Sequence, residues 1–342
     1  MSEAVARKSM TIFHVFHYAS EELGGAQKII HDIHREGGES SKILAFDYVW
    51  DGANRKASSL FAFLTLLARV LFLDKDAFLF LHHRMFLPVT WFLPNRSAFV
   101  CHNIFPSKNR AFRLFGKAQC IAISEEVKAY LLSWNPAFRV TLIPNGMAEA
   151  GDDRHRHVAD AVVDVGFVGR LDRQKGLDLL VEAARRLVVD EGCPIRLHLV
   201  GPDGDLGEAL RAMSADGSVP EGLLQLYGYH RDPFALMRDM DLLCIPSRYE
   251  GFGLVYYEAL ERNHFILAAD LPVFHAYDWD RATVFFEADR LASLTEKLRE
   301  CCDRALRGDP TADLPKRHAI PTEQAMAAAY LDFARHRLAE RG

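Results

Sequence analysis

Several features that define other classes of protein are missing from this sequence of 342 residues. Its six cysteines include no C-x-x-C spacing, and several lie in apolar runs, so we expect free thiols in a reduced, cytoplasmic compartment. The longest apolar run, residues 60–73, contains Arg69 and is too short to cross a bilayer. The first ten residues hold no apolar signal core, and we expect them to form a frayed tail.

A strong excess of charge is also missing. The net charge is −5, with 17 Lys and Arg against 13 Asp and Glu in residues 1–150 and 24 against 33 in the remainder. The basic bias of the first half is too weak to predict nucleic-acid binding, and the contrast between halves favours two domains with different ligands. No G-x-G-x-x-G motif follows a strand, which argues against a nicotinamide oxidoreductase.

What the sequence does contain is a regular alternation of apolar strand-like runs and helical patterns. Strands are expected at residues 11–17, 43–46, 78–82, 98–102, 119–123, 140–143, 163–168, 195–200, 223–226 and 241–245. Helices between and after them are expected at residues 24–35, 125–132, 176–189 and 323–338, among others. Continuous apolar strands separated by helices predict an α/β fold whose parallel sheets are covered on both faces.

A turn-rich and then polar stretch, residues 144–157, interrupts this alternation. We therefore expect two doubly wound, Rossmann-like parallel-sheet domains, residues 1–150 and 151–320, that face each other across a central cleft. Residues 321–342 would form a helix that packs back across the domain junction. Ligands of such sheets bind outside the carboxyl ends of the strands, so the loops at those ends are the first place to look for a site.

The first candidate site is the loop that follows the strand predicted at residues 163–168. Gly169 ends this strand, and Arg170 and Lys175 flank a short loop before the next helix. Arginine offers a planar fork to phosphate, lysine a point charge and a helix start free N–H groups, so the loop suits a diphosphate. Cations are unfavourable at a helix N-terminus unless an anion offsets them. The alternative is a loop whose basic side chains are merely solvated.

The second candidate is a pair of carboxylates eight positions apart, Glu250 and Glu258. Between them the run Phe252-Gly253-Leu254 makes a turn that opens a helix, directly after the apolar strand 241–245. Carboxylates favour hydroxyl groups while the helix start favours an anion, and a sugar nucleotide offers both. The alternative makes Glu250 a turn residue and Glu258 an ordinary position of an amphipathic helix.

Two weaker candidates lie in the first half. Gly25 belongs to a glycine pair after the first strand, where the backbone could approach a ligand closely or simply make a tight turn. His102 ends the strand predicted at residues 98–102, which would bring it to the cleft, although a single histidine can equally be structural.

Three D-x-D patterns could hold a divalent metal on a diphosphate: residues 203–205, 239–241 and 278–280. None is near Arg170 and Lys175 in the sequence, and two fixed cations make a metal unnecessary there.

Residues 108–117 interleave basic and aromatic side chains, which suits an anionic membrane surface or an anionic acceptor. A solvated face with one buried stripe would give the same pattern.

Taken together, these motifs resemble those of the retaining, GT-B-fold glycosyltransferases of family 4. The resemblance covers nearly the whole chain and is strongest between residues 121 and 260. Residues 121–127 and 143–146 are similar to the last strand of the family's first domain and its linker. One departure follows Ala268, where the family's glycine-rich loop is replaced by residues 269–275.

The resemblance implies a role for each site residue. Arg170 and Lys175 would clamp the diphosphate, Glu250 would contact the donor sugar, the backbone around Gly253 would offer N–H groups, and Glu258 would hold the ribose hydroxyls. His102 would contact the sugar. The candidate residues are Arg170, Lys175, Glu250, His102, Gly25, Gly169, Phe252, Gly253, Leu254 and Glu258, with no metal ligand among them.

The activity implied is transfer of a hexose from a UDP- or GDP-linked donor to an acceptor hydroxyl with retention of configuration, without a metal or a resident cofactor. The acceptor implied is a glycan or a lipid-linked intermediate in bacterial surface polysaccharide or lipopolysaccharide biosynthesis, at the inner face of the cell membrane. No nucleic acid is expected as a partner. A non-catalytic protein that binds a nucleotide sugar or serves as a scaffold is the alternative on the same fold.

Overall fold

The computed structural model describes residues 10–16, 24–38, 41–45, 72, 76–104, 110–148, 161–277, 283–308 and 320–340. The chain divides into two compact units, the first made of residues 1–146 and 320–342 and the second of residues 147–319. The sequence placed the boundary at residue 150. The polar stretch 151–157 and most of the apolar run 60–73 lie outside the described residues.

Unit 1 contains a parallel sheet whose described strands follow the order β2-β1-β3-β4-β5-β6. The strands are β1 (Thr11–Phe16), β2 (Ser41–Ala45), β3 (Ala77–Leu81), β4 (Ser97–Cys101), β5 (Gln119–Ala122) and β6 (Arg139–Leu142). Every residue of β3, β4 and β5 is buried, as expected for apolar strands covered on both faces, whereas the edge strand β6 is partly exposed.

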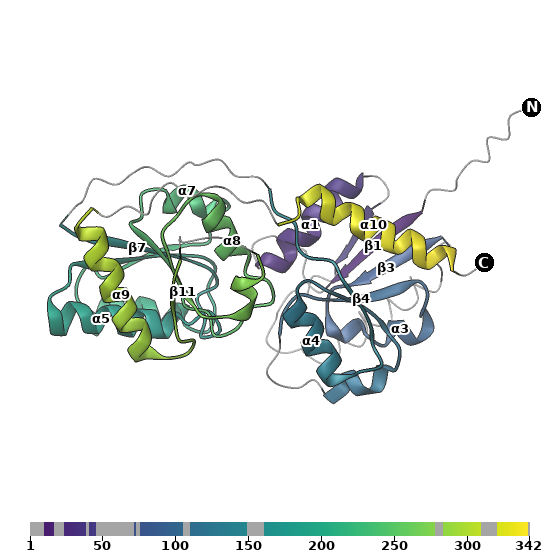
Figure 1. The fold of residues 1–342 in the computed structure, drawn as a ribbon, viewed down its shortest axis with the longest axis horizontal. Coiled ribbons are helices and arrows are strands. Elements are labelled where there is room, and N and C mark those ends of the chain that lie inside the picture. The colour runs from purple at the N-terminus through teal and green to yellow at the C-terminus, as the bar shows by residue number, and fades with distance from the viewer. Residues whose placement is uncertain are drawn as a thin grey trace, which may run out of the picture. The chain divides into compact units, whose positions relative to one another are not determined.

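The helices of unit 1 include one that arrives from the far end of the chain. They are α1 (Gly25–Gly37), α3 (Val89–Phe92), α4 (Glu125–Trp134) and α10 (Glu323–Ala339), with short 3₁₀ helices η3 (Arg84–Phe86) and η4 (Arg110–Phe115). Helix α10, yellow in Figure 1, lies beside α1. An ion pair of 2.6 Å joins Arg35 to Glu323, and the Tyr330 ring packs 5.0 Å from that of Phe80. These contacts make the last helix part of the first unit.

Unit 2 contains a second parallel sheet, in the order β12-β11-β10-β7-β8-β9. Its strands are β7 (Val163–Val168), β8 (Ile195–Val200), β9 (Leu224–Gly228), β10 (Leu242–Ile245), β11 (Ile266–Ala269) and β12 (Thr283–Phe286). Counted along the chain within the unit, this is the Rossmann order 3-2-1-4-5-6 read from the other edge. The expectation of an α/β fold with parallel sheets is therefore confirmed.

Helices complete the described part of unit 2. They are α5 (Leu177–Glu191), α6 (Gly207–Asp216), α7 (Pro233–Met237), α8 (Leu254–Glu261), α9 (Leu291–Leu306) and the 3₁₀ helix η5 (Pro272–His275). Helices α5 and α9 pack side by side, and α8 contacts β10 and β11 (Figure 1). The apolar stripe of α5 faces the core, with Leu177, Leu180 and Leu187 fully buried.

The chain offers no bilayer-spanning helix within its described part. The six cysteines are free thiols in the structure, five of them buried and Cys193 partly exposed. Burial raises the pKa of Cys101 to about 12 and that of Cys301 to about 12, which keeps both thiols protonated. These side chains behave as small core hydrophobes.

Candidate functional site

The strand order of unit 2 brings two distant loops together. Strands β7 and β10 are neighbours although β8 and β9 lie between them in the chain. From β7 the chain adds strands toward one edge of the sheet, and from β10 it adds them toward the other. Such a switch point is where parallel sheets bind ligands. Loop 169–176 follows β7 and loop 246–253 follows β10. A hydrogen bond of 2.9 Å from the N–H of Arg248 to the carbonyl of Gln174 joins the two loops.

Loop 169–176 is held in shape by one buried carboxylate. Asp172 is 8% exposed, accepts the N–H of Lys175 at 3.0 Å and pairs with the guanidinium of Arg170. Gly176 then takes a left-handed conformation, with φ of 69°, and caps α5. A Cβ atom at Gly176 would lie 1.8 Å from the carbonyl oxygen of Pro246, so only glycine fits between the two loops.

The two loops also share an ion pair. The ammonium of Lys175 lies 2.6 Å from Oε1 of Glu250, and the hydroxyl of Ser247 donates to the same oxygen at 2.7 Å. The side chains of Lys175 and Glu250 are 22% and 10% exposed. The fold thus joins the two motifs that the sequence singled out separately.

This pairing corrects one step of the sequence argument. Lysine and arginine before a helix were taken to need an external anion, but Lys175 is paired with Glu250 and Arg170 with Asp172. A ligand phosphate would have to share these cations with carboxylates of the chain. The presence of the cations alone is therefore weaker evidence for a phosphate than the sequence indicated.

The second loop ends in the start of α8. Gly253 has φ of 86°, and a Cβ atom there would lie 2.4 Å from the ring of Phe274 in η5. Helix geometry leaves the N–H groups of Leu254 and Val255 without partners inside α8, so they can face an anion. The side chain of Phe252 is 4% exposed and packs on the ring of Tyr257, 5.4 Å away, so this residue serves the core.

Glu258 stands one turn along α8 from Leu254 and is half-buried. Residues four apart share a helix face, so Glu258 projects from the same face of α8 as Leu254, the first residue of the helix. Eight of the ten candidate residues thus belong to the switch point of one unit: Arg170, Lys175, Gly169, Glu250, Phe252, Gly253, Leu254 and Glu258.

A known sequence family matches this region. The family described as glycosyl transferases group 1 matches residues 163–304, which takes in both loops and every described strand of the second sheet. The second unit is thus similar to the glycosyl transferases of group 1. The matched residues include Arg170, Lys175, Glu250 and Glu258.

Individual relatives are similar to parts of the chain. A D-inositol 3-phosphate glycosyltransferase of Nocardia farcinica is 35% identical over 123 residues, which is 31% of this chain and 25% of that protein. A lipopolysaccharide core biosynthesis mannosyltransferase of Rhizobium meliloti is 27% identical over 183 residues, or 50% of this chain and 52% of the relative. The chain thus spans between about a quarter and about half of the length of these curated relatives.

A solved structure resembles the chain over nearly its full length. The Anabaena protein HepE, solved in complex with UDP and glucose, has a TM-score of 0.67 and 17% sequence identity over 97% of this chain and 99% of that chain. This likeness concerns the fold, which is that of the GT-B glycosyltransferases.

In unit 2 a third cation, Arg248, holds the phosphate-type loop to its surroundings. Arg248 bonds to both carboxylate oxygens of Asp178 in α5, at 2.7 and 3.1 Å, to Asp289 at 2.7 Å and to the carbonyl of Arg173. Burial alone would raise the pKa of Asp178, but the hydrogen bonds and charge of Arg248 outweigh it and lower that pKa. The sequence analysis missed Asp172, Ser247 and Arg248. Only Asp172 left a signal, since an aspartate that opens a loop commonly binds the backbone ahead of it.

The aspartates that might have held a metal in unit 2 are engaged by other groups. Asp203 forms a bidentate pair with Arg211, at 2.9 and 2.7 Å, and Asp205 accepts the N–H of Arg173 at 2.9 Å. Asp241 accepts the N–H of Asp164 at 2.9 Å. Residues 278–280 lie outside the described residues. Within the described ranges, no three His, Cys, Asp or Glu side chains are grouped to hold a metal ion.

The two remaining candidates belong to unit 1. Gly25 is the first residue of α1 and follows Gly24, whose φ is 137°. His102 directly follows β4, and its Nε2 lies 2.8 Å from Nδ1 of His82. That contact extends to His14, a third histidine that the sequence analysis did not consider.

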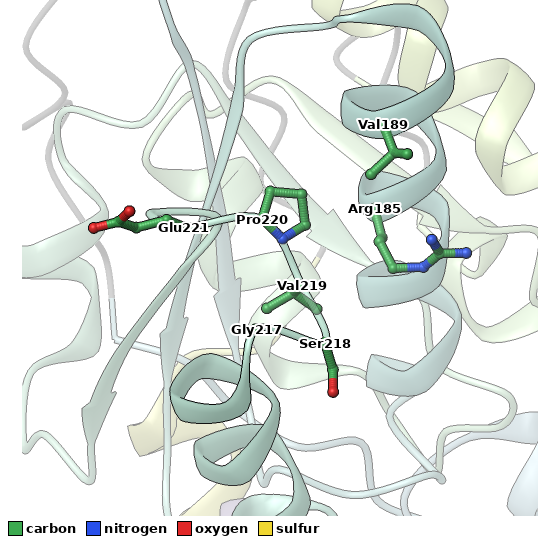
Figure 2. Close-up of a pocket in the computed structure, with 7 residues that line it drawn as sticks. All are labelled: Arg185, Val189, Gly217, Ser218, Val219, Pro220 and Glu221. Carbon is green, nitrogen blue, oxygen red and sulfur yellow. The ribbon is translucent and has the colours of Figure 1, made fainter.

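A pocket of about 370 Å³ opens elsewhere on unit 2 (Figure 2). It lies between α5 and the turn that leads into the start of β9, and is lined by Arg185, Val189, Gly217, Ser218, Val219, Pro220 and Glu221. Two of its polar side chains are occupied, since Arg185 pairs with Glu182 and the hydroxyl of Ser218 donates to Asp216. The pocket is at the amino ends of the strands, away from the switch point.

Proposed function

We propose that the protein is a retaining glycosyltransferase of family 4 that transfers a hexose from a nucleoside-diphosphate sugar to an acceptor hydroxyl. The observation that carries the proposal is the contact of 2.6 Å between Lys175 and Glu250. It unites a cation and a hydroxyl-binding carboxylate at the starts of α5 and α8, at the switch point of a unit similar to the group 1 glycosyl transferases.

The chemistry suits departure of a diphosphate. Breaking the bond to the sugar leaves positive charge on the sugar ring and negative charge on the diphosphate. Lys175 and Arg170, with the N–H groups at the start of α8, stabilise the leaving diphosphate as its charge develops. Glu250 accepts a hydrogen bond from a hydroxyl of the donor sugar, and Glu258 accepts hydrogen bonds from the ribose hydroxyls.

Retention of configuration follows from attack on the same face that the diphosphate leaves. The acceptor oxygen bonds to the anomeric carbon, the bond to the phosphate oxygen breaks, and that phosphate takes the acceptor proton. The nucleophile in this route is the acceptor oxygen, while Lys175 and Ser247 hold Oε1 of Glu250 in place. Catalysis is then positioning and electrostatics, with two fixed cations in the place of a metal ion.

The donor and pathway are proposed from the relatives and from exposed aromatic side chains. HepE was solved with UDP and glucose, and the Rhizobium relative is a lipopolysaccharide mannosyltransferase, so a UDP- or GDP-linked hexose and a glycan or lipid-linked acceptor in surface polysaccharide biosynthesis fit best. Tyr227 and Tyr229, at the carboxyl end of β9, are 46% and 42% exposed and offer rings to a nucleoside base.

The test of the proposal is a thermal-shift panel of UDP, GDP, ADP and NAD, followed by a transfer assay with the donors of the nucleotide that binds. Stabilisation by one nucleoside diphosphate together with sugar transfer supports the proposal. Binding without transfer to any acceptor would favour the non-catalytic alternative. Stabilisation by NAD alone would contradict both.

Glu258→Ala is expected to weaken nucleoside-diphosphate binding about 10- to 100-fold, the scale of losing a charged hydrogen-bond acceptor. Isothermal titration of the stabilising nucleotide measures this change. Glu296→Ala, which removes an exposed carboxylate from α9, is the matched control and should leave the affinity unchanged. A Glu258→Ala variant with the affinity of the wild type would disprove the ribose role.

Contact with an anionic membrane surface is also proposed, from an exposed patch on unit 1. Three large apolar side chains are exposed there: Trp91 by 55%, Phe92 by 58% and Leu114 by 68%. Trp91 packs 4.9 Å from the Phe115 ring, which brings α3 against η4, and Arg113 and Lys117 are exposed on the same segment. Aromatic side chains beside cations are typical of surfaces that rest on anionic lipid.

Replacing Trp91 and Phe92 by serine is expected to lower sedimentation with anionic liposomes several-fold, because it removes the inserted apolar area. Tyr229→Ser, which removes an exposed aromatic ring from unit 2, is the control. Equal pelleting of wild type with anionic and neutral liposomes would rule out the membrane contact. If the Trp91/Phe92 double variant and Tyr229→Ser sediment equally with anionic liposomes, the membrane contact lies elsewhere on the protein.

A further inference from the structure

Three histidines form a hydrogen-bonded row across the sheet of unit 1. Nδ1 of His14 in β1 lies 2.9 Å from Nε2 of His82, and Nδ1 of His82 lies 2.8 Å from Nε2 of His102. Adjacent rings are inclined by 26° and 25° and their centroids lie 5.2 and 5.0 Å apart, close to the N···N distance plus two ring radii, so each contact lies near both ring planes, where imidazole donates and accepts. Strands β1, β3 and β4 are neighbours, which brings the three residues together.

All three rings are neutral. Burial, together with the nearby His34 and His102, lowers the pKa of His14 to about 3. Burial lowers the pKa of His102 to about 4, and burial, His102 and His14 together hold the pKa of His82 well below its ordinary value. A neutral imidazole has one proton, so each ring in the row donates through one nitrogen and accepts through the other.

The row therefore has only two arrangements of protons. Either all three rings hold the proton on Nδ1 and donate toward His102, or all hold it on Nε2 and donate toward His14. The first leaves Nδ1–H of His102 free to donate, and the second leaves Nε2–H of His14 at the other end. No described residue binds either terminal nitrogen.

The surroundings of the two ends favour the first arrangement. His14 is 0% exposed and stacks against Phe80, so a proton on its Nε2 would be an orphaned N–H in an apolar site. Such groups are rare in native proteins because no hydrogen bond offsets the free-energy cost of removing them from water. Nδ1 of His102 is also buried and has no partner among the described residues, but His102 stands at the carboxyl end of β4, where parallel sheets bind ligands, so a bound ligand can accept its N–H.

We propose that His14 and His82 are positioning residues that hold the proton of His102 on Nδ1, so that this N–H donates to a hydroxyl oxygen of a sugar bound at the carboxyl end of β4. The identity of the ligand rests on the proposed function, whereas the proton arrangement does not. Aligned hydrogen bonds polarise one another, so the row strengthens the donor that it presents. A buried His14 remote from any ligand thereby acts on the ligand through two neighbours.

Nitrogen-15 NMR of histidine-labelled, ligand-free protein tests the proton arrangement, because the two tautomers give distinct ring-nitrogen signals. We expect the Nδ1–H form for all three residues in the wild type. In His14→Phe the signal of His102 should shift toward a mixture of tautomers. In His14→Asn, whose amide N–H can donate to His82 in the same place, the Nδ1–H form should return. An Nε2–H signal for His102 in the wild type overturns the proposal.

Kinetics supply the second readout. His14→Phe should lower kcat/KM for transfer about 3- to 10-fold, the scale of one hydrogen bond, and His14→Asn should recover most of it. His264→Phe is the control, since it replaces a 1% exposed histidine of unit 2. If the NMR result holds but no donor is transferred, the proposed function fails and the proton arrangement stands. If transfer occurs and His14→Phe changes neither readout, the positioning role is wrong.

Discussion

Lys175→Ala should transfer sugar about 100-fold more slowly than the wild type, or slower still, because a preorganised charge that stabilises a leaving group typically contributes this much. The loss should fall mainly on turnover, since the charge of the diphosphate is largest after the bond breaks. The same variant should lose the thermal stabilisation that the nucleoside diphosphate gives to the wild type. Steady-state kinetics with the identified donor measure the first effect, and thermal shift measures the second.

The contact with Glu250 makes a second variant necessary. Removing Lys175 also leaves that carboxylate with only Ser247 as a described partner, so a loss of activity could come from a displaced Glu250. Ser247→Ala disturbs the same oxygen but keeps the cation, and should cost less than 10-fold, about one hydrogen bond. Lys297→Ala, which breaks the exposed pair with Glu300 on α9, should cost nothing. A Lys175→Ala loss below a few fold would count against the diphosphate role.

Gly176→Ala is expected to reduce the free energy of unfolding by about 4 kcal/mol or more, in the range that only a severe local conflict produces. The left-handed φ of 69° alone costs an L-residue about 1–2 kcal/mol. In addition, the new Cβ would stand 1.8 Å from the carbonyl oxygen of Pro246, and one of the two loops would have to move. Urea denaturation measures the loss.

The same helix supplies the control. Gly192 ends α5 as Gly176 begins it, with φ of 68°, but a Cβ there meets no heavy atom within 4 Å. Gly192→Ala should therefore cost only the conformational share, about 1–2 kcal/mol. The difference between the variants isolates the clash between loops. Equal losses would mean that the two loops are not in contact as described.

Much of the fold could be predicted because its strands are apolar along their whole length. The expected bounds of β7 and β8 agree with the observed ones, Val163–Val168 and Ile195–Val200. The analysis did not identify β11 (Ile266–Ala269) or β12 (Thr283–Phe286). Both are short apolar runs, and periodicity alone does not separate such a run from a buried segment of helix.

The site could be predicted as separate motifs but not as a constellation. Lys175 and Glu250 stood out by composition, yet their contact depends on β7 and β10 being neighbours, and strand order leaves no mark in a single sequence. The partners Asp172 and Ser247 are ordinary loop residues by type. The histidine row could not be predicted for the same reason, because His14 lies in β1 while His82 and His102 directly follow β3 and β4.

The return of α10 to unit 1 has a consequence for the order of events during synthesis. A ribosome makes the six described strands of the first sheet, then the whole of unit 2, and only then the helix that covers Phe80 with Tyr330. Unit 2 is contiguous and can fold as soon as it emerges, whereas the earlier unit must wait with part of its apolar surface exposed. The first part of the chain to be made is thus the last to be completed, and its exposed strands are the ones that a chaperone would have most reason to cover.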